Sequence, residues 1–238
     1  MLWANSNLQM DAEKPTRFEF DLVANKYDSW YETAKGQMYD RLEKKAISRY
    51  LPPSTKDKKL LEVGCGTGHW SRFFSEYGFE VTGVDISERM IDIAKSKNIS
   101  NVSFQVADGH SLPFAYDTFD VTAAITTLEF VHDADSVVKE MVRCTCKPGG
   151  QLLIGALNGL ARLNRNMKKR PESPYAKVQL FSPSQLKELL ECYGQVHMVT
   201  TGFVHKQAVL LPLTPLFDAI GRFLHIPYGA FIAAEVKL

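Results

Sequence analysis

The chain has 238 residues, of which 45% are hydrophobic and 23% are charged, so it is long enough to bury one core of good size or two small ones. The 28 Lys and Arg residues and the 27 Asp and Glu residues leave a formal charge of +1. This balance excludes a protein that holds nucleic acid mainly through its overall field, and we do not expect nucleic acid as a partner.

The N-terminal residues and the cysteines favour a cytoplasmic location. The residues before Asp11 lack the basic and apolar regions of a secretory signal. Four cysteines are present, Cys65, Cys144, Cys146 and Cys192. They form no Cys-x-x-Cys pair, so we expect free thiols and no metal site. Prolines and charged residues interrupt the apolar stretch 208–234, so we expect no transmembrane segment and assign the stretch to packing against the sheet or a dimer partner.

Apolar residues between positions 17 and 50 recur at helical spacing, which predicts an N-terminal helical segment that Gly36 interrupts and that Pro52 stops. From Lys59 onward, short apolar runs alternate with amphipathic helical segments, a pattern typical of βαβ units and a parallel sheet. The predicted strands are 59–64, 80–85, 102–107, 119–126, 150–157, 195–203 and 230–237.

Capping residues predict where the intervening helices begin. Ser87 opens one helix, Asp133 or Asp135 opens another, and Ser182 precedes a proline at the first position of a helix over 183–193. The segment 158–181 has no clean period and is long for a connection. We therefore expect it to be a functional insert or a lid.

A glycine-rich loop follows the first predicted strand. Gly64, Gly66 and Gly68 come directly after the apolar run, and a helix follows at once, so the backbone can pass closely under a ligand at the carboxyl end of that strand. Asp85 ends the next strand, where a carboxylate can accept both hydroxyls of a ribose. His69 stands where a dinucleotide fingerprint needs its third glycine, which argues against a nicotinamide cofactor, and the loop has no P-loop ending.

Further motifs follow at consistent spacing. In chain order the motifs are 27–31 (YDSWY), 62–68 (EVGCGTG), 84–87 (VDIS), 107–109 (ADG), 112–114 (LPF), 119–120 (FD), 128–133 (LEFVHD) and 147–150 (KPGG). In these motifs the chain resembles the class I S-adenosylmethionine-dependent methyltransferases. Within that class it is similar to the small-molecule group that includes the ubiquinone and menaquinone biosynthesis type. The resemblance covers roughly residues 27–193.

The resemblance implies an α/β fold with a Rossmann-like, seven-stranded, mostly parallel sheet, an antiparallel last strand, helices on both faces and an N-terminal helical cap. We expect one methyltransferase domain over 1–238, with the cap at 17–50 and a core at 51–238 that carries the insert 158–181. The implied cofactor is S-adenosyl-L-methionine, with S-adenosyl-L-homocysteine as its product. Three glycines would pass beneath its methionine part and ribose, namely Gly64, Gly66 and Gly68.

The other cofactor contacts implied by the resemblance come from the strand ends and the cap. Asp85 would bind the ribose hydroxyls. The adenine contacts would come from Ile86, Met90, Asp108 and Gly109, with the Asp108 carboxylate accepting from the adenine amino group. The contacts to the amino-acid end would come from Thr126, Thr127 and the Tyr27 phenol.

Methyl transfer from a sulfonium needs alignment above all, and a general base only when the acceptor carries a proton to be lost. The candidates near the methyl group are Tyr31, Glu129 and His132, together with Asn158 or Tyr175 from the insert. Asp133 could orient His132, although helix capping is the simpler role for that carboxylate. The sequence after the fourth strand, Thr126 to Glu129, departs from the Asn-Pro-Pro-Tyr pattern of enzymes that methylate amino groups of nucleobases or glutamine.

The function favoured by the sequence is methyl transfer to a small-molecule acceptor, with the acceptor atom (O, N, S or C) and its anionic or apolar character left open. Three alternatives are a methyltransferase acting on RNA or protein, a non-catalytic S-adenosylmethionine-binding protein, and a nucleotide-dependent oxidoreductase, which the glycine spacing disfavours. A homodimer is also left open. The insert carries five basic residues, Arg162, Arg165, Lys168, Lys169 and Arg170. They could draw in an anionic substrate, a phospholipid surface or RNA, or simply form a solvated loop.

Overall fold

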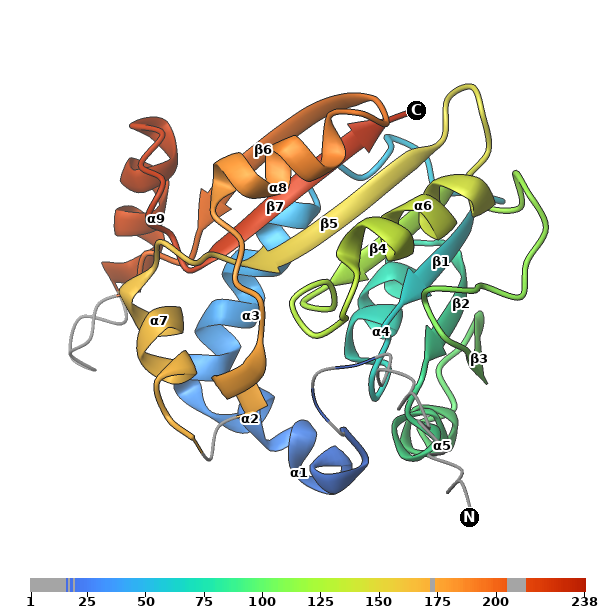
Figure 1. Ribbon diagram of the computed structural model, residues 1–238, viewed down its shortest axis with the longest axis horizontal. Helices are drawn as coiled ribbons and strands as arrows, with labels where there is room; N and C mark the ends of the chain where they lie inside the picture. Colours follow the sequence, from blue (N-terminus) through green and yellow to red (C-terminus); the bar gives the residue numbers. More distant parts are fainter. Residues whose placement is uncertain (1–15, 17, 19, 172–173, 205–212) are drawn as a thin grey trace, which may run out of the picture.

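The computed structural model describes residues 16, 18, 20–171, 174–204 and 213–238 (Figure 1). One sheet holds the strands β1 Lys59–Val63, β2 Glu80–Asp85, β3 Val102–Val106, β4 Val121–Ile125, β5 Gln151–Leu157, β6 Gln195–Thr201 and β7 Phe231–Lys237. Their order is β3-β2-β1-β4-β5-β7-β6. The first five strands pair in parallel, and β7 lies antiparallel between β5 and β6. The predicted fold class is confirmed, and every predicted strand lies within two residues of its predicted ends.

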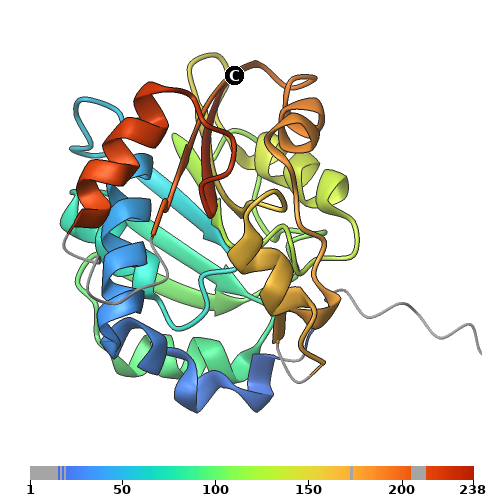
Figure 2. The same cartoon turned by 90° about the vertical axis from the view of Figure 1, so that its left-hand side faces the viewer.

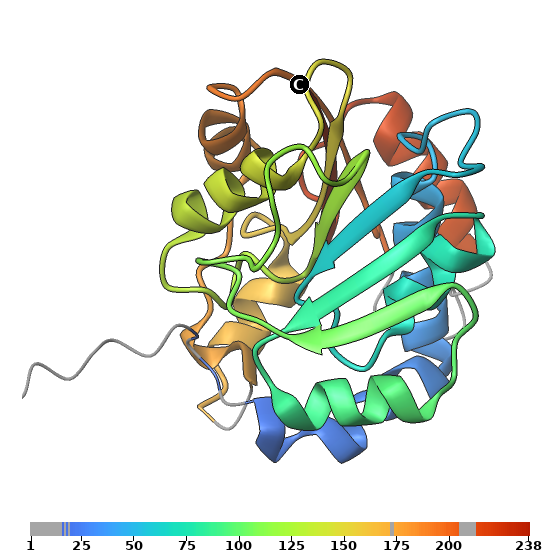
Figure 3. The same ribbon diagram turned by 90° about the vertical axis from the view of Figure 1, so that its right-hand side faces the viewer.

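Helices cover both faces of the sheet. They are η1 Phe20–Leu22, α1 Ala24–Tyr27, α2 Ser29–Glu32, α3 Ala34–Ile47, α4 His69–Glu76, α5 Glu88–Ser96, α6 Ala134–Cys144, α7 Arg162–Lys168, η2 Pro174–Lys177, α8 Pro183–Leu190 and α9 Thr214–Phe223. Figures 2 and 3 show α3 and α9 on one side of the sheet and α6 and α8 on the other. A parallel sheet covered in this way has two buried faces.

The strand sequences explain this arrangement, because successive side chains point to opposite faces. Leu61 and Leu152 join a buried cluster with residues of α6 and α8. Their neighbours Leu60 and Leu153 join a second buried cluster with residues of α3 and α4. The near-continuous apolar runs in the sequence therefore supply both layers of the core.

The predicted helix starts are confirmed by cap geometry. The Ser87 hydroxyl accepts a hydrogen bond from Met90 N at 3.1 Å. Of the two aspartates considered for α6, Asp133 is the cap, since its carboxylate accepts from Ser136 N at 3.1 Å. Ser182 opens α8 with a complete capping box. Each cap satisfies backbone donors that the first helical turn leaves unpaired.

The N-terminal helices break at positions other than the predicted one. Gly36 lies inside α3, whereas the breaks fall at Asp28 and Thr33, which flank α2. Thr33 caps α3 by accepting a hydrogen bond from Gly36 N at 2.9 Å. A Cβ atom at Gly36 would lie 1.9 Å from the Trp30 carbonyl oxygen. This glycine therefore permits the close approach of α2 to α3, and the prediction that it interrupts the helix was wrong.

The insert 158–181 contains α7 and η2 and is tied back to the sheet. Its two ends form an isolated parallel bridge between Asn158 and Phe181. The Asn158 side chain donates to Gly229 O at 2.7 Å, and Lys168 Nζ donates to Val178 O at 2.7 Å. The insert is therefore ordered by specific polar contacts.

The apolar stretch 208–234 only partly behaves as predicted, and its first residues lie outside the described ranges. The β7 portion is buried in the sheet, but Leu216 and Phe223 of α9 are 58% and 81% exposed. The prediction that this stretch packs against the sheet is therefore wrong for the apolar side chains of α9, because Thr214, Asp218 and Gly221 occupy the face that α9 turns inward. The alternative of packing against a dimer partner stays a prediction. None of the helices in the described ranges combines the length and the apolar character needed to cross a bilayer.

Candidate functional site

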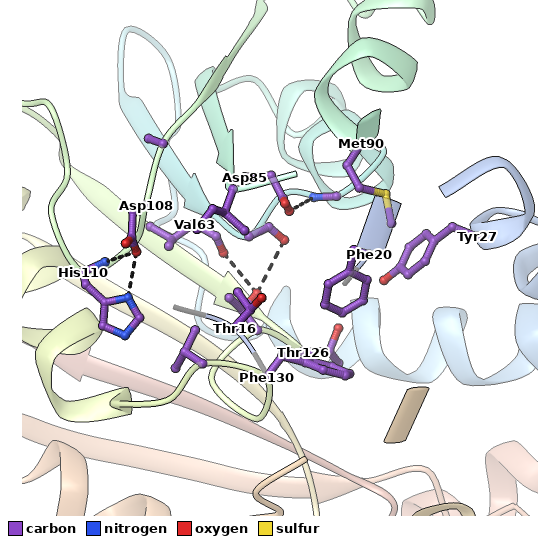
Figure 4. A pocket seen from close by; sticks show the side chains of 17 residues that line it. Thr16, Phe20, Tyr27, Val63, Asp85, Met90, Asp108, His110, Thr126 and Phe130 are labelled. Carbon is purple, nitrogen blue, oxygen red and sulfur yellow. Dashed lines mark hydrogen bonds and ion pairs between the residues drawn. The ribbon is translucent and has the colours of Figure 1, made fainter. Parts of the chain in front are cut away.

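A pocket opens at the carboxyl ends of β1 to β4, the usual ligand position in an open α/β sheet (Figure 4). Ten of the eleven predicted cofactor residues line it: Tyr27, Gly64, Gly66, Asp85, Ile86, Met90, Asp108, Gly109, Thr126 and Thr127. Gly68 does not line the pocket. It caps α4 in the left-handed region, with φ 80°.

The glycine loop needs its glycines for backbone geometry. Gly64 and Gly66 have φ of 72° and 53°, a region in which side chains are strained. A Cβ at Gly64 would lie 2.3 Å from the Thr127 Cγ2 atom. Thr127 is fixed there because its hydroxyl donates to Val63 O at 3.1 Å. The loop therefore borders the pocket with its backbone atoms, because no side chain projects from Gly64 or Gly66.

Backbone N–H groups of the surrounding loops fix the orientation of the Asp85 carboxylate. Its Oδ2 accepts from Gly66 N at 2.8 Å, and its Oδ1 accepts from Ser87 N at 2.9 Å. Each carboxylate oxygen has a further lone pair, so two more donors can bind. Burial raises the pKa of Asp85, and the backbone donors oppose that rise. This arrangement fits the two adjacent hydroxyls of a ribose.

At the other end of the pocket, the predicted Asp108 forms a pair with His110, which sequence reasoning missed (Figure 4). Asp108 Oδ1 accepts from His110 N at 2.9 Å and lies 2.7 Å from the ring Nδ1. The turn after β3 thus fixes the carboxylate before any ligand arrives. An aspartate followed two residues later by a backbone donor is a common turn signal, which could have indicated His110.

Aromatic residues from the N-terminal segment form the outer wall of the pocket. Phe20 packs edge-on against Tyr27 at a ring distance of 6.5 Å and against Phe130 at 4.9 Å. Thr16 reaches the same pocket through a bridge to Val131. Sequence reasoning missed Thr16 and Phe20. Phe20 precedes Tyr27 by two helical turns, and this spacing is the signal that could have indicated Phe20.

The N-terminal helices are fastened to the glycine loop by a set of partly buried polar contacts. Asp28 accepts from the Thr67 hydroxyl at 2.6 Å and pairs with Lys97 Nζ at 2.6 Å. Lys97 also donates to Thr67 O at 2.7 Å. Asp21 adds a hydrogen bond from the Ser87 hydroxyl. The position of the cap is therefore set by the same loops that shape the pocket.

Tyr31 stands beside the pocket without lining it. Its ring stacks on His69 with centroids 3.6 Å apart and lies edge-on to the Tyr27 ring at 6.4 Å. His69 Nε2 lies 2.7 Å from Asp40 Oδ1. Burial raises the pKa of Tyr31 well above its ordinary value, so its phenol keeps its proton at neutral pH. A catalytic role for Tyr31 stays a prediction of the sequence.

Glu129 is fully buried where the loop after β4 meets the insert. Its Oε1 accepts a hydrogen bond from Leu157 N, and its backbone carbonyl accepts from Gln179 N at 2.9 Å. Its Oε2 is buried and has no hydrogen-bond partner within the described ranges. Burial raises the pKa of Glu129 to about 7. The group can therefore exchange a proton near neutral pH.

His132 lies apart from this pocket. It lines a separate hollow with residues of α8, including Gln185 and Leu189. The neighbouring Asp133 caps α6, as the simpler interpretation expected. Tyr31 thus contacts Tyr27, which lines the cofactor pocket, and Glu129 immediately precedes Phe130, which also lines it, whereas His132 lines the separate hollow.

Comparisons with known proteins agree with this geometry. A family model described as a methyltransferase domain matches residues 61–154. The chain is 30% identical over 197 residues to the ubiquinone biosynthesis O-methyltransferase of Coxiella burnetii, covering 76% of this chain and 79% of the relative. An S-adenosylmethionine-dependent methyltransferase of Thermotoga maritima has a similar structure, with a TM-score of 0.72 and 24% identity over 92% of this chain and 97% of that one.

A second similar structure was solved with S-adenosyl-L-methionine bound. It is phosphoethanolamine N-methyltransferase 2 of Haemonchus contortus in complex with S-adenosyl-L-methionine, with a TM-score of 0.61 and 17% identity over 91% of this chain and 57% of that one. The chain belongs to the class I S-adenosylmethionine-dependent methyltransferases. It is an enzyme of this class, and S-adenosylmethionine is its cofactor.

Proposed function

We propose that the methyl acceptor is a small molecule that enters between the N-terminal cap and the insert. The observation that carries this proposal is the aromatic enclosure of the pocket. Phe130 lies 4.9 Å from Phe20 of the cap and 5.8 Å from Tyr175 of the insert. An acceptor that must pass between these rings has to be small or must extend a thin reactive group. The acceptor atom can be O, N, S or C within this proposal.

The cofactor contacts are proposed as the sequence implied them. Asp85 binds the ribose hydroxyls, since its two oxygens are already oriented by Gly66 N and Ser87 N. Ile86 and Met90 hold the adenine, which reaches toward Asp108. Burial raises the pKa of Tyr27, so its phenol stays protonated and donates to the cofactor carboxylate. When bound, the cofactor supplies a methyl group on a positively charged sulfur.

Glu129 is the proposed general base for acceptors that must lose a proton. As the new bond to carbon forms and the carbon–sulfur bond breaks, the acceptor proton passes to Glu129 Oε2. This oxygen is buried and has no hydrogen-bond partner within the described part of the chain, so a donor from the acceptor would satisfy it. Tyr31 helps to position the Tyr27 phenol by packing edge-on against its ring, with centroids 6.4 Å apart.

The test is incubation with methyl-labelled S-adenosylmethionine and a cell extract divided into small-molecule, lipid, RNA and protein fractions. Asp85→Ala serves as the blank. Label in the small-molecule or lipid fraction supports the proposal, and the labelled compound identifies the acceptor. Label confined to RNA or protein contradicts it.

A macromolecular acceptor is the second candidate, and one observation favours it. Arg162 and Arg165 are exposed on α7, beside the proposed entrance, and could hold a polyanion such as RNA. Activity on RNA would then fall steeply with salt, whereas activity on a neutral small molecule would not. A cytoplasmic location also stays a prediction of the sequence.

A further inference from the structure

Helix α9 turns polar residues towards the protein and apolar residues towards solvent. Thr214, Asp218 and Gly221 form its buried stripe, and the first two of these are polar. The opposite stripe is apolar and exposed, and it consists of Leu213 (47%), Leu216 (58%), Phe217 (37%), Ile220 (46%), Phe223 (81%) and Leu224 (58%). A helix on a globular protein ordinarily turns its apolar stripe inward. An exposed apolar patch of this kind marks an interaction site.

The orientation of α9 is fixed by buried polar contacts. Asp218 Oδ1 accepts from the Thr201 hydroxyl at 2.7 Å and from Gly202 N at 2.8 Å. Its second oxygen forms a salt bridge with Arg222. Rolling the helix to bury its apolar stripe would expose the carboxylate's partners and leave them unpaired, which is costly. The outward apolar stripe is therefore built into the fold.

A groove connects α9 to the basic insert. It is lined by Lys35 of α3, Arg162 of α7, Phe217 of α9 and Tyr228, which is itself 62% exposed. Figure 2 shows α3, α7 and α9 on the face turned to the viewer. We call the surface formed by α7, α9 and this groove the α7–α9 face.

The exposed charged side chains of the α7–α9 face are all positive among the described residues. Arg162, Arg165, Lys169 and Arg170 are exposed, and residues 158–171 contain no acidic residue. The acidic residue of α9, Asp218, is fully buried in its salt bridge. The face therefore combines exposed leucine and phenylalanine side chains with an exclusively positive rim among the described residues.

We propose that the α7–α9 face docks on the surface of an anionic lipid bilayer. Leucine and aromatic side chains on one helix face enter the boundary between headgroups and acyl chains, and nearby Lys and Arg residues are attracted to anionic headgroups. A second copy of the chain fits less well, because a symmetric contact would bring the two positive rims together. RNA would match the charge but leave the aliphatic side chains without a partner.

The proposal is tested by sedimenting the full chain with phosphatidylcholine vesicles that contain phosphatidylglycerol or lack it. The apolar variant is Leu216→Ser with Phe223→Ser, and its control is Tyr116→Ser, which removes a 72% exposed aromatic on the connection into β4. The charge variant is Arg162→Gln with Arg165→Gln. Its control is Lys56→Gln with Lys59→Gln, two exposed residues beside the start of β1.

We expect the wild type to bind vesicles with phosphatidylglycerol and to bind pure phosphatidylcholine much more weakly. The apolar variant should lose binding at least tenfold, and the charge variant should lose about fivefold for each charge removed. The two controls should bind as the wild type does. Unchanged affinity of every variant for S-adenosylhomocysteine shows that they are folded, and it separates this test from the identity of the methyl acceptor.

Three results would overturn the proposal. One is absence of wild-type binding to anionic vesicles. Another is equal vesicle binding by the wild type and both face variants. The third is a concentration-dependent dimer, measured by light scattering, that Leu216→Ser with Phe223→Ser abolishes, because the face would then be covered by a second copy.

Discussion

Replacing Asp85 is the sharpest perturbation of the cofactor pocket, because this carboxylate connects the glycine loop to the proposed ribose site. Its oxygens accept from Gly66 N at 2.8 Å and from Ser87 N at 2.9 Å, and each has room for one ribose hydroxyl. Asp85→Ala removes the hydroxyl contacts and should weaken S-adenosylmethionine binding by about 1 to 3 kcal/mol, which is ~5- to ~150-fold in Kd. Asp85→Asn keeps one acceptor oxygen, so its Kd should lie between those of the wild type and Asp85→Ala.

Isothermal titration calorimetry with S-adenosylmethionine measures these affinities directly. Asp120→Ala is the matched control, because Asp120 also accepts a backbone hydrogen bond, from Lys59 N at 2.9 Å, at the opposite end of β1. It should lower the free energy of unfolding by about 1 kcal/mol and leave Kd unchanged. An Asp85→Ala protein that folds and binds with wild-type affinity would refute the ribose assignment.

Three other perturbations test the loop, the buried acid and the cap. Gly64→Ala places a Cβ 2.3 Å from a threonine methyl at φ 72° and should cost more than about 2 kcal/mol in chemical denaturation. Burial raises the pKa of Glu129 from 4.5 to about 7 in the folded protein. As the pH rises, the unfolded chain therefore loses this proton at a lower pH than the folded protein does. Wild-type unfolding free energy should therefore fall by about 3 kcal/mol relative to Glu129→Gln as pH rises from about 4.5 to about 7. Asp28→Ala should accelerate hydrogen exchange in α1 and α2 while α4 keeps its protection.

Each of these three predictions has a control or a result that would contradict it. Gly149→Ala has φ 95° with no atom within 4 Å of the new Cβ, so it should cost only the backbone term of about 1 to 2 kcal/mol. Equal losses at Gly64 and Gly149 would show that the threonine contact is unimportant. Parallel pH curves for wild type and Glu129→Gln would show that Glu129 is not protonated in the fold. Unchanged exchange in Asp28→Ala would mean that other contacts fasten the cap.

The sheet and most of the cofactor pocket were predictable because their signals are local. The consecutive apolar residues Leu60 and Leu61, which are buried on opposite faces of the sheet, mark a strand with two covered faces. The positive φ of Gly64 and Gly66 is a property that few residue types tolerate, so these glycines identify the loop. Asp85 follows from its place at the end of a strand next to that loop.

The parts that escaped prediction depend on contacts between distant segments. Gly36 looks like a helix breaker in the sequence, but it is required by the Trp30 carbonyl of the preceding helix. The polarity of α9 follows from the bonds of Asp218 to β6, which no periodicity reveals. Periodicity identifies an apolar stripe but does not state which way that stripe faces.

The central claim is that the pocket at the carboxyl ends of β1 to β4 holds the cofactor with its ribose on Asp85. A crystal structure of the chain with S-adenosylhomocysteine tests this most directly. We expect both ribose hydroxyls within hydrogen-bonding distance of the Asp85 carboxylate, and the homocysteine carboxylate beside the Tyr27 phenol. A ligand bound with its ribose away from Asp85, or outside this pocket, would contradict it.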